Sequence, residues 1–227
     1  MSSVKVWGRP TSTNTQRVLW TLVEAEVPYE LILASATTGA NGYVWQGKTP
    51  YGIVDTQAYL SMNPNGTIPT IEDGGFILWE SNAIVAYLAR RYAPDRLYGD
   101  SETTFARALQ WMIWTNYSLD PALHALIMHL QRLPANQRSA ETVESSRREV
   151  IRKLELMETQ LGGSRYFAGD RFTIGDIALG ISAQRFFHFA LARPPLTRMQ
   201  SWLARLGERK GFCTHVAPRE KHLPFKD

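Results

Sequence analysis

The hydrophobic pattern of this 227-residue chain changes near residue 100, and that change constrains its fold more than any other feature. Before it, short alternating segments typical of strands intermingle with segments of helical spacing, as in an α/β unit. From about Ser101 onward the strand signals disappear and long helical periodicities replace them. We therefore predict two domains, residues 1–93 and 101–227, joined by the turn-forming segment 94–100.

The first domain is predicted to have the order β-α-β-(loop, short helix)-β-β-α. Its strands are expected at residues 4–7, 29–33, 68–72 and 76–79. The last two strands form a hairpin across Asp73-Gly74-Gly75. A first helix is expected over residues 14–27, and Ser81 is predicted to be the N-cap of a second helix that runs to about Tyr92.

The second domain is predicted to be all-helical. Its helices are expected near residues 102–130, 143–161, 174–189 and 196–208. At the start of the third, Thr173 as N-cap and Asp176 as N3 residue form a capping box, and Phe172 and Ile177 stand at the positions of a hydrophobic staple. These four residues are therefore interpreted as a folding device outside the active site.

Charge and cysteine usage exclude several classes of protein. The net charge is only +4, the basic residues are spread along the chain, and no apolar run approaches the roughly 18 residues of a membrane span, so neither nucleic acid nor membrane is expected as a partner. Cys213, the single cysteine, excludes a CxxC pair and a cysteine zinc cluster. His124 and His129 do not share a helical face, so no metal site is predicted. Without an export signal, the protein is expected in the cytoplasm.

Two short segments of the first domain carry candidate binding chemistry. The stretch from Asn63 to Thr70 places turn-forming residues directly before a strand with an early proline, a pattern that also fits an ordinary loop entering an edge strand. Glu80-Ser81 follows the hairpin at the predicted start of a helix. A hydroxyl and free backbone N–H groups at that position suit a carboxylate, and Glu80 offers a negative partner for an ammonium group.

In their order along nearly the whole chain, these segments resemble the glutathione S-transferase superfamily, in its bacterial theta-like and nu-like form. The resemblance implies a thioredoxin-like N-terminal domain, an all-helical C-terminal domain and glutathione as co-substrate. It implies a cis Ile68–Pro69 peptide whose Ile68 backbone contacts the cysteinyl part of glutathione, with Glu80 and Ser81 at the γ-glutamyl group. It also implies a homodimer that pairs the N-terminal domain of one protomer with the helical domain of the other.

The loop between the first strand and the first helix resembles the catalytic loop of that superfamily. Thioredoxin-like redox proteins carry a reactive cysteine pair there, whereas this chain carries hydroxyls and an amide. The resemblance assigns stabilisation of the glutathione thiolate to Ser12 first, Asn14 second and Thr11 third, because a donor at a helix N-terminus lowers the pKa of a thiol. Ser12 and Asn14 also fit a simpler role as helix caps.

Two further assignments rest on the same resemblance. The connection over residues 34–55 is longer than usual, and its one basic residue, Lys48, is assigned to the glycyl carboxylate of glutathione. The substrate pocket is assigned to one face of the first helix of the second domain, although such a stripe is also typical of a packed core. Its residues are Arg107, Trp111, Trp114 and Tyr117.

The predicted function is conjugation of the glutathione thiolate to a small electrophile. One alternative is a glutathione-dependent disulfide or peroxide reductase, in which glutathione supplies both reducing equivalents. A second alternative is a non-catalytic binding module that keeps the transferase fold. The presence of Ser12 and Glu80-Ser81 favours an enzyme over the module.

Overall fold

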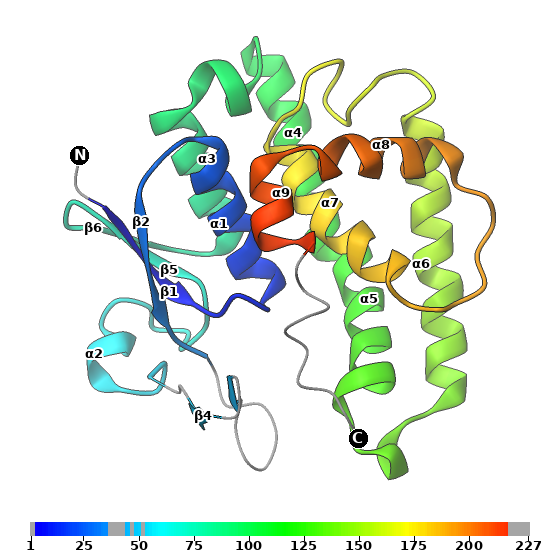
Figure 1. The fold of residues 1–227 in the computed structure, drawn as a ribbon, viewed down its shortest axis with the longest axis horizontal. Helices are drawn as coiled ribbons and strands as arrows, with labels where there is room; N and C mark the ends of the chain where they lie inside the picture. The colour runs from blue at the N-terminus through cyan, green and yellow to red at the C-terminus, as the bar shows by residue number, and fades with distance from the viewer. Residues whose placement is uncertain (1–2, 36–43, 46–47, 51–52, 218–227) are drawn as a thin grey trace. The chain divides into compact units, whose positions relative to one another are not determined.

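The computed structural model describes residues 3–35, 44–45, 48–50 and 53–217, and for residues 44–45 and 48–50 it describes the backbone alone. The chain divides into two compact units. The first combines Met1–Leu97 with Lys210–Pro224, and the second combines Tyr98–Arg209 with Phe225–Asp227. In the colour scale of Figure 1, the first unit runs from blue to cyan-green and ends in red, and the second runs from green to orange.

A four-stranded mixed sheet of order β2-β1-β5-β6 forms the centre of the first unit. Its strands are β1 (Val4–Gly8), β2 (Tyr29–Leu33), β5 (Thr70–Asp73) and β6 (Phe76–Trp79). β1 pairs in parallel with β2 and antiparallel with β5, while β5 and β6 form the predicted hairpin. β5 begins two residues later than predicted, so Ile68 and Pro69 belong to the loop before it.

Helices α1 (Thr13–Glu24) and α3 (Ser81–Tyr92) pack against each other beside this sheet (Figure 1). The core of the unit consists of apolar residues at helical or alternating spacing that are fully buried. They include Val4, Val6, Val18, Leu19, Leu22, Ile71, Ile84 and Leu88. A thioredoxin-like arrangement with the predicted element order is thereby confirmed.

The start of α3 differs from the prediction, because Ser81 is its first residue and not its N-cap. Glu80 holds the cap position with φ 75, and its carboxylate accepts a hydrogen bond of 3.4 Å from the backbone N–H of Asn82. Because the Glu80 carboxylate accepts the hydrogen bond at the N-cap, the Ser81 hydroxyl does not cap the helix.

The long connection after β2 contains more structure than the sequence predicted. Its described residues form two short antiparallel strands, β3 (Val44–Trp45) and β4 (Lys48–Pro50). The predicted short helix is present as α2 (Gln57–Leu60), whose N-cap Thr56 accepts a hydrogen bond from the Tyr59 N–H. Residues 36–43, 46–47 and 51–52 of this connection lie outside the described part of the chain.

A helix that the sequence did not predict, α9 (Lys210–His215), packs on α1 in the first unit (Figure 1). The contact is close, because a Cβ atom at Gly211 would clash with the Trp20 ring. The Phe212 ring packs edge-on against Trp20, with centroids 5.3 Å apart. The sequence prediction placed residues 101–227 in one helical domain, whereas these contacts group α9 with the sheet-containing unit.

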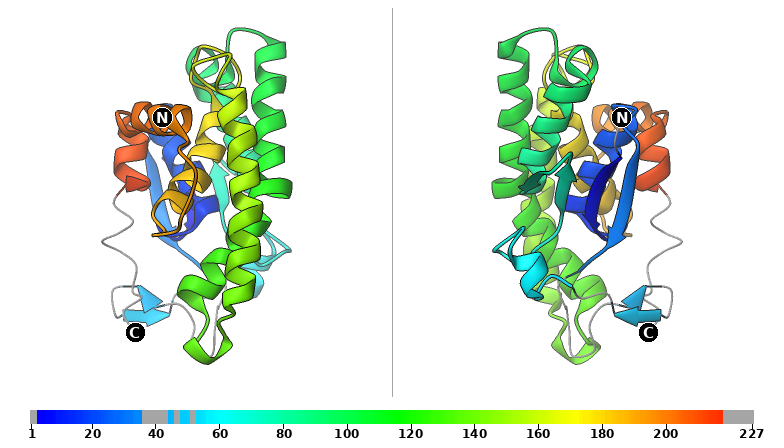
Figure 2. Two further views of the ribbon diagram at one scale, coloured as in Figure 1. Left: turned by 90° about the vertical axis from the view of Figure 1, so that its right-hand side faces the viewer. Right: turned by 90° about the vertical axis from the view of Figure 1, so that its left-hand side faces the viewer.

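The second unit is all-helical in its described residues, which confirms the predicted class. Its α-helices are α4 (Glu102–Trp114), α5 (Asp120–Ile127), α6 (Ala140–Gln160), α7 (Ile174–Phe187) and α8 (Thr197–Gly207). Helix α7 is buried along most of its length and packs against α4, α5 and α8. The predicted continuous helix over 102–130 is interrupted by a π-helical turn at Thr115–Leu119 between α4 and α5. Figure 2 shows α6 as the longest helix of this unit.

The predicted capping box is present at the start of α7. The Asp176 carboxylate accepts hydrogen bonds from the Thr173 N–H at 3.0 Å, the Phe167 N–H at 3.2 Å and the Trp202 indole N–H at 3.0 Å. Burial raises the pKa of Asp176 to about 6 against the lowering effect of these donors. The cap therefore also links α7 to α8 through Trp202.

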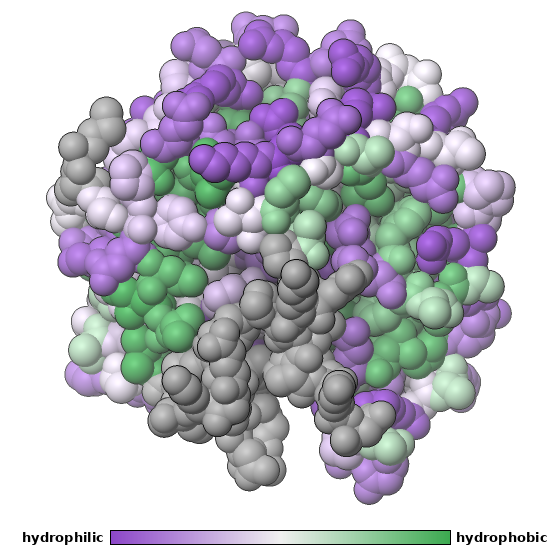
Figure 3. Space-filling view, in the orientation of Figure 1, coloured by the Kyte–Doolittle hydropathy of each residue, from purple (hydrophilic) through white to green (hydrophobic). Residues whose placement is uncertain are grey.

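The surface of the second unit follows from the amphipathic character of its helices. Helix α8 buries Met199, Trp202 and Leu206 and directs hydrophilic side chains to solvent on the face shown in Figure 3. No helix within the described residues has the length and apolarity to cross a membrane.

Candidate functional site

A cavity of about 340 Å³ in the first unit gathers residues that lie far apart in the sequence. Its walls come from α1, the loop before β5, the end of β6 and the start of α3. The lining residues are Asn14, Asn65, Thr67, Ile68, Pro69, Trp79, Glu80 and Ser81. Five of the residues assigned from the sequence thus meet at one place, and the volume is within the range of small-molecule sites. The Ile68–Pro69 peptide is cis, as the resemblance implied.

Ser81 gives one end of this cavity the character of an anion site. Its side chain is 2% exposed, and its hydroxyl has no hydrogen-bond partner among the described residues. A buried hydroxyl without a partner costs free energy that a bound acceptor recovers. The hydroxyl sits in the first turn of α3, where backbone N–H groups and the helix dipole also favour a negative charge.

Glu80 places a negative charge directly beside this anion site. Its side chain is exposed, and among the described residues it accepts the 3.4 Å hydrogen bond from the Asn82 N–H alone, so carboxylate lone pairs remain for a cationic group. Its φ of 75 lies in a region that costs a residue with a side chain of the order of 1–3 kcal/mol. Such strain is concentrated at functional sites. Adjacent sites for an anion and a cation suit a group that carries both charges on one carbon.

A buried hydrogen-bond network holds the loop that lines the opposite wall. The Tyr59 hydroxyl donates to the Thr67 carbonyl at 2.6 Å, and Asn63 Nδ2 donates to the same oxygen at 2.9 Å. Asn63 Nδ2 also donates to Thr70 Oγ1 at 3.1 Å, and Thr70 Oγ1 lies 2.9 Å from the Tyr59 hydroxyl. Because Tyr59 has one proton to donate, the Thr70 hydroxyl donates to Tyr59. These three side chains position Thr67 immediately before Ile68.

The first turn of α1 separates the three residues assigned to the thiolate. Ser12 is the N-cap and accepts a long hydrogen bond of 3.4 Å from the Thr15 N–H. Asn14 is exposed and lines the cavity, whereas Ser12 is half-buried and Thr11 is buried, and neither lines this cavity. The first turn of α1 contains no acidic residue, so its positive end is not neutralised there. The ranking of Ser12 before Asn14 stays a prediction.

The remaining assigned residues lie elsewhere. Lys48 belongs to β4, but its side chain is outside the described part of the structure. In the second unit, Arg107 and Tyr117 are exposed, while Trp114 is half-buried. Trp111 is only 8% exposed, and its ring lies 4.9 Å from that of Phe167 in the helical core. The pocket role of these four residues stays a prediction.

Sequence reasoning missed three residues that line the cavity. Asn65 and Thr67 stand within the segment that was singled out, between residues 63 and 70, and Trp79 directly precedes Glu80. The signal that could have identified them is that they are adjacent in sequence to assigned residues. The sequence does not predict the direction of each side chain, because that direction depends on the turn at Asn63 and on the end of β6.

Comparisons with known proteins relate both units to one family. Residues 11–91 match the family model "Glutathione S-transferase, N-terminal domain", and residues 140–205 match "Glutathione S-transferase, C-terminal domain". The chain is 38% identical to glutathione S-transferase GstB of Escherichia coli K12, with 91% of this chain and 94% of the relative covered. It is 31% identical to glutathione S-transferase 3 of Zea mays, with coverages of 96% and 95%.

A solved structure gives the same result. The chain is similar to the theta class glutathione S-transferase of Xanthomonas axonopodis pv. citri with glutathione bound, at a TM-score of 0.84 and 35% identity. The similarity covers 95% of this chain and 98% of that one.

Proposed function

The chain belongs to the glutathione S-transferase family, and we propose that it conjugates the thiolate of glutathione, bound in the cavity of the first unit, to a small electrophile. The observation that carries this proposal is the meeting of the Glu80 carboxylate, Asn14 and the Ser81 hydroxyl, which lacks a partner in the described part of the chain, around one cavity. In this arrangement Ser81 and the start of α3 bind the γ-glutamyl carboxylate. Glu80 binds the ammonium group on the same carbon, and the loop at Ile68 and Pro69 contacts the cysteinyl part.

The catalytic task of the protein is to favour thiolate over thiol at neutral pH. Ser12 and Asn14 supply a hydroxyl and an amide donor at the positive end of α1, and Thr11 precedes them in the loop. A donor and a helix dipole stabilise the charged form of sulfur more than the neutral form, which lowers its pKa. We assign the direct contact with sulfur to Ser12 first, Asn14 second and Thr11 third.

Three more residue assignments complete the proposal. Lys48 pairs with the glycyl carboxylate through its ammonium group. The pocket for the acceptor substrate is formed by residues of the helical unit, namely Arg107, Trp111, Trp114 and Tyr117. Tyr117 is 83% exposed, so this residue is accessible to a ligand or to another chain.

We further propose a cytoplasmic homodimer that pairs the first unit of one protomer with the helical unit of its partner. Apolar surface on each unit supports this arrangement. On the edge strand β6, Phe76, Ile77 and Trp79 are 48%, 40% and 41% exposed, and in the helical unit Ile113 is 55% exposed. Exposed apolar side chains on the edge strand of a sheet are typical of an interaction surface.

The test compares the wild-type protein with Ser12→Ala, Asn14→Ala and the double variant. We measure glutathione binding by calorimetry, the pKa of bound thiol by thiolate absorbance, and turnover of a chlorinated dinitrobenzene and of hydroxyethyl disulfide. The double variant is expected to bind glutathione, to raise the pKa of the bound thiol by at least about one unit and to lower turnover of the chlorinated aromatic by about tenfold or more at neutral pH. Unchanged thiol pKa and turnover in a folded double variant would refute the assignment.

The two substrates decide between the enzymatic alternatives. Turnover of the chlorinated aromatic supports transfer, whereas reduction of the disulfide alone would replace conjugation with reductase activity. If the wild-type protein releases no heat with glutathione, the remaining interpretation is a non-catalytic binding module that keeps the transferase fold.

A further inference from the structure

One face of α1 is covered by α9, from the fourth residue of α1 to its last (Figure 1). Side chains spaced four residues apart share a helical face, and on α1 those of Gln16, Trp20 and Glu24 make this contact. Trp20 packs edge-on against Phe212, and the Glu24 carboxylate accepts a hydrogen bond of 3.4 Å from the Gly211 N–H. Both helices belong to the first unit, so the contact lies within one compact body.

The Gln16 side chain makes the contact nearest the start of α1. Its Nε2 atom donates a 2.7 Å hydrogen bond to the carbonyl oxygen of His215, the last residue of α9. The last carbonyl groups of a helix have no partner within that helix, so this donor satisfies one of them. Gln16 is 1% exposed, and its Oε1 atom accepts no hydrogen bond among the described residues. The buried amide is therefore oriented by its bond to the end of α9.

The backbone of Gln16 connects this contact to the residues proposed to hold the thiolate. Its N–H donates a 2.8 Å hydrogen bond to the carbonyl oxygen of Ser12, the N-cap of α1. The hydrogen bond from the Thr15 N–H to the Ser12 hydroxyl is long, at 3.4 Å, and therefore weak. The direction of that hydroxyl thus depends on how the backbone of the first turn is held. Two hydrogen bonds in series hold it, from Ser12 through Gln16 to His215.

His215 is itself anchored to the sheet of the first unit. Its Nε2 atom lies 2.9 Å from the hydroxyl of Tyr29, the first residue of β2. β2 pairs with β1, whose last residue, Gly8, leads into the loop that contains Ser12. The carbonyl group that accepts from Gln16 therefore belongs to a segment fixed on the same sheet that positions this loop.

We propose that Gln16 is a positioning residue for the transferase reaction, which uses the end of α9 as a support to hold Ser12 and Asn14 in the direction that stabilises the thiolate. The inference rests on the proposed function, because it adds a support to the proposed thiolate residues. Gln16 does not line the cavity, so it acts through the first turn of α1 and not through contact with glutathione. Its role concerns ionisation of the bound thiol, whereas binding of glutathione relies on the start of α3.

The test compares the wild-type protein with Gln16→Met, which keeps the approximate volume of the side chain and removes the donor. The pKa of the bound thiol is measured by thiolate absorbance, and kcat and the KM for glutathione are measured over a range of pH with a chlorinated dinitrobenzene. Gln16→Met is expected to raise the pKa of the bound thiol by about half a unit, which lowers kcat by about threefold at a pH below that pKa.

The shape of the pH profile separates positioning from a general loss of structure. At a pH above both pKa values the thiol is ionised in both proteins, so kcat of Gln16→Met should equal that of the wild type. The KM for glutathione should change by less than about twofold, because the groups proposed to bind glutathione are unaltered. A variant that is merely less well folded would lose kcat by the same factor at every pH.

Glu24→Met is the matched control on α1. It removes the hydrogen bond to Gly211 at the opposite end of α1 from Ser12. Glu24→Met and Gln16→Met should both lower thermal stability, whereas only Gln16→Met should change the pKa of the bound thiol.

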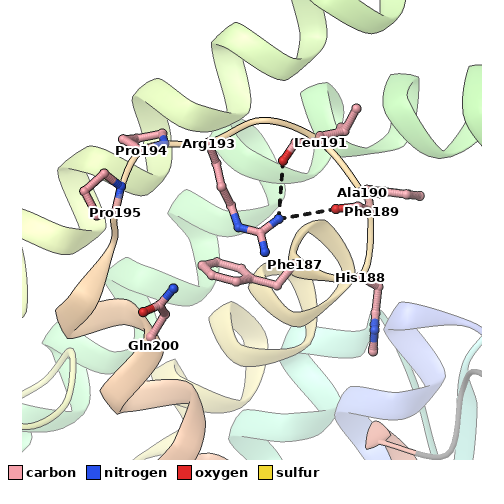
Figure 4. Close-up of a pocket in the computed structure, with 9 residues that line it drawn as sticks. All are labelled: Phe187, His188, Phe189, Ala190, Leu191, Arg193, Pro194, Pro195 and Gln200. Atoms are coloured by element: carbon pink, nitrogen blue, oxygen red, sulfur yellow. Dashed lines mark hydrogen bonds between the residues drawn. The ribbon is translucent and has the colours of Figure 1, made fainter.

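Arg193→Met is the control for the kind of bond. In the second unit, Arg193 Nη1 donates to the carbonyl oxygen of Phe189 at 3.3 Å, in the segment that follows α7 (Figure 4). This is also a hydrogen bond from a side chain to a backbone carbonyl group, but it does not involve α1 or α9. Arg193→Met should leave the pKa of the bound thiol and kcat unchanged.

Gly211→Ala tests the support from the side of α9. The added Cβ atom clashes with the Trp20 ring and displaces α9 from α1. This variant should raise the pKa of the bound thiol as Gln16→Met does. The double variant should raise it no further, because both changes break the same hydrogen bond. Gly211→Ala also carries the test if Gln16→Met fails to fold.

Three results would overturn the proposal while leaving the proposed function intact. One is a kcat of folded Gln16→Met that is unchanged, or lowered equally at every pH. Another is an equal rise of the thiol pKa in Glu24→Met, and the third is an additive effect of Gln16→Met and Gly211→Ala. A wild-type protein that neither binds glutathione nor turns over the chlorinated aromatic would instead refute the proposed function, and this assignment with it.

Discussion

The hydroxyl of Tyr59 donates a 2.6 Å hydrogen bond to the carbonyl oxygen of Thr67, the residue directly before the cis Ile68–Pro69 peptide. Tyr59 is 1% exposed and does not line the cavity, yet it fixes the loop that does. In the proposed glutathione site it is therefore a positioning residue, which supports the loop and does not contact the ligand.

Replacing Tyr59 with Phe should raise the KM for glutathione by about fivefold with little change in kcat, because the loop loses one of two donors to the Thr67 carbonyl. Steady-state kinetics with glutathione as the varied substrate measure this. Tyr87→Phe is the control, because it also removes a tyrosine hydroxyl, which donates a 2.7 Å hydrogen bond to Asp73. Tyr87 does not line the cavity. Equal changes in KM for both variants would contradict a positioning role.

Ser81→Ala should weaken glutathione binding by about tenfold and leave the free energy of unfolding within about 0.5 kcal/mol of the wild type. The reason is that the Ser81 hydroxyl has no partner within the described fold, so its removal affects only the bound state. Calorimetry measures the affinity for glutathione, and urea denaturation measures the free energy of unfolding. Ser182→Ala removes a 2.6 Å hydrogen bond to Asp120, so it should lower the free energy of unfolding and leave the affinity for glutathione unchanged.

Asp176→Ala should lower the free energy of unfolding by roughly 3–5 kcal/mol, because it leaves the Thr173, Phe167 and Trp202 donors without their buried acceptor. Urea denaturation monitored by tryptophan fluorescence measures the loss. Asp170→Ala removes a carboxylate that accepts one exposed backbone N–H, from Arg165, and should cost less than about 1 kcal/mol. Similar losses for both aspartates would argue against the linking role of Asp176.

His215 makes the stability of the first unit depend on pH. Its Nε2 atom lies 2.9 Å from the Tyr29 hydroxyl, and burial lowers the pKa of His215 from 6.5 to about 4. Between these values the unfolded chain binds the proton more readily than the folded chain. Stability is therefore complete above about pH 6.5 and falls as the pH decreases toward 4, by roughly 3 kcal/mol at most.

His215→Gln keeps an acceptor for Tyr29 but does not titrate, so its stability should decline less than that of the wild type between pH 7 and pH 4. Urea denaturation at a series of pH values gives the comparison. His188→Gln, at an exposed histidine of the other unit, should retain the wild-type decline. A parallel pH dependence of His215→Gln and wild type would assign the decline to other groups.

Patterns that are local in the sequence were predicted well. The period-two spacing of Val4 and Val6, the Asp73-Gly74-Gly75 turn and the box formed by Thr173 and Asp176 each specify their element through neighbours within a few residues. The order of elements and the class of both units were predictable for the same reason. Of the candidate site, Ile68, Pro69, Glu80, Ser81 and Asn14 were named from the sequence and line one cavity.

Features that depend on distant contacts were not predictable. Helix α9 has six residues, too few for a periodic signal, and it is held by two residues far earlier in the chain, Trp20 and Glu24. The transfer of the cap from Ser81 to Glu80 depends on a backbone angle at the end of β6 that no residue type announces.

The sequence by itself determined the element order and the change from a sheet-containing to a helical unit, because these follow from short-range periodicity, and its resemblance to a known family named the residues proposed to bind glutathione. Only the tertiary structure decided that Asn14 lines the cavity, that Ser81 is free of capping and that Tyr59 supports the loop. These outcomes depend on side-chain directions and burial, which are set when segments distant in the chain pack together.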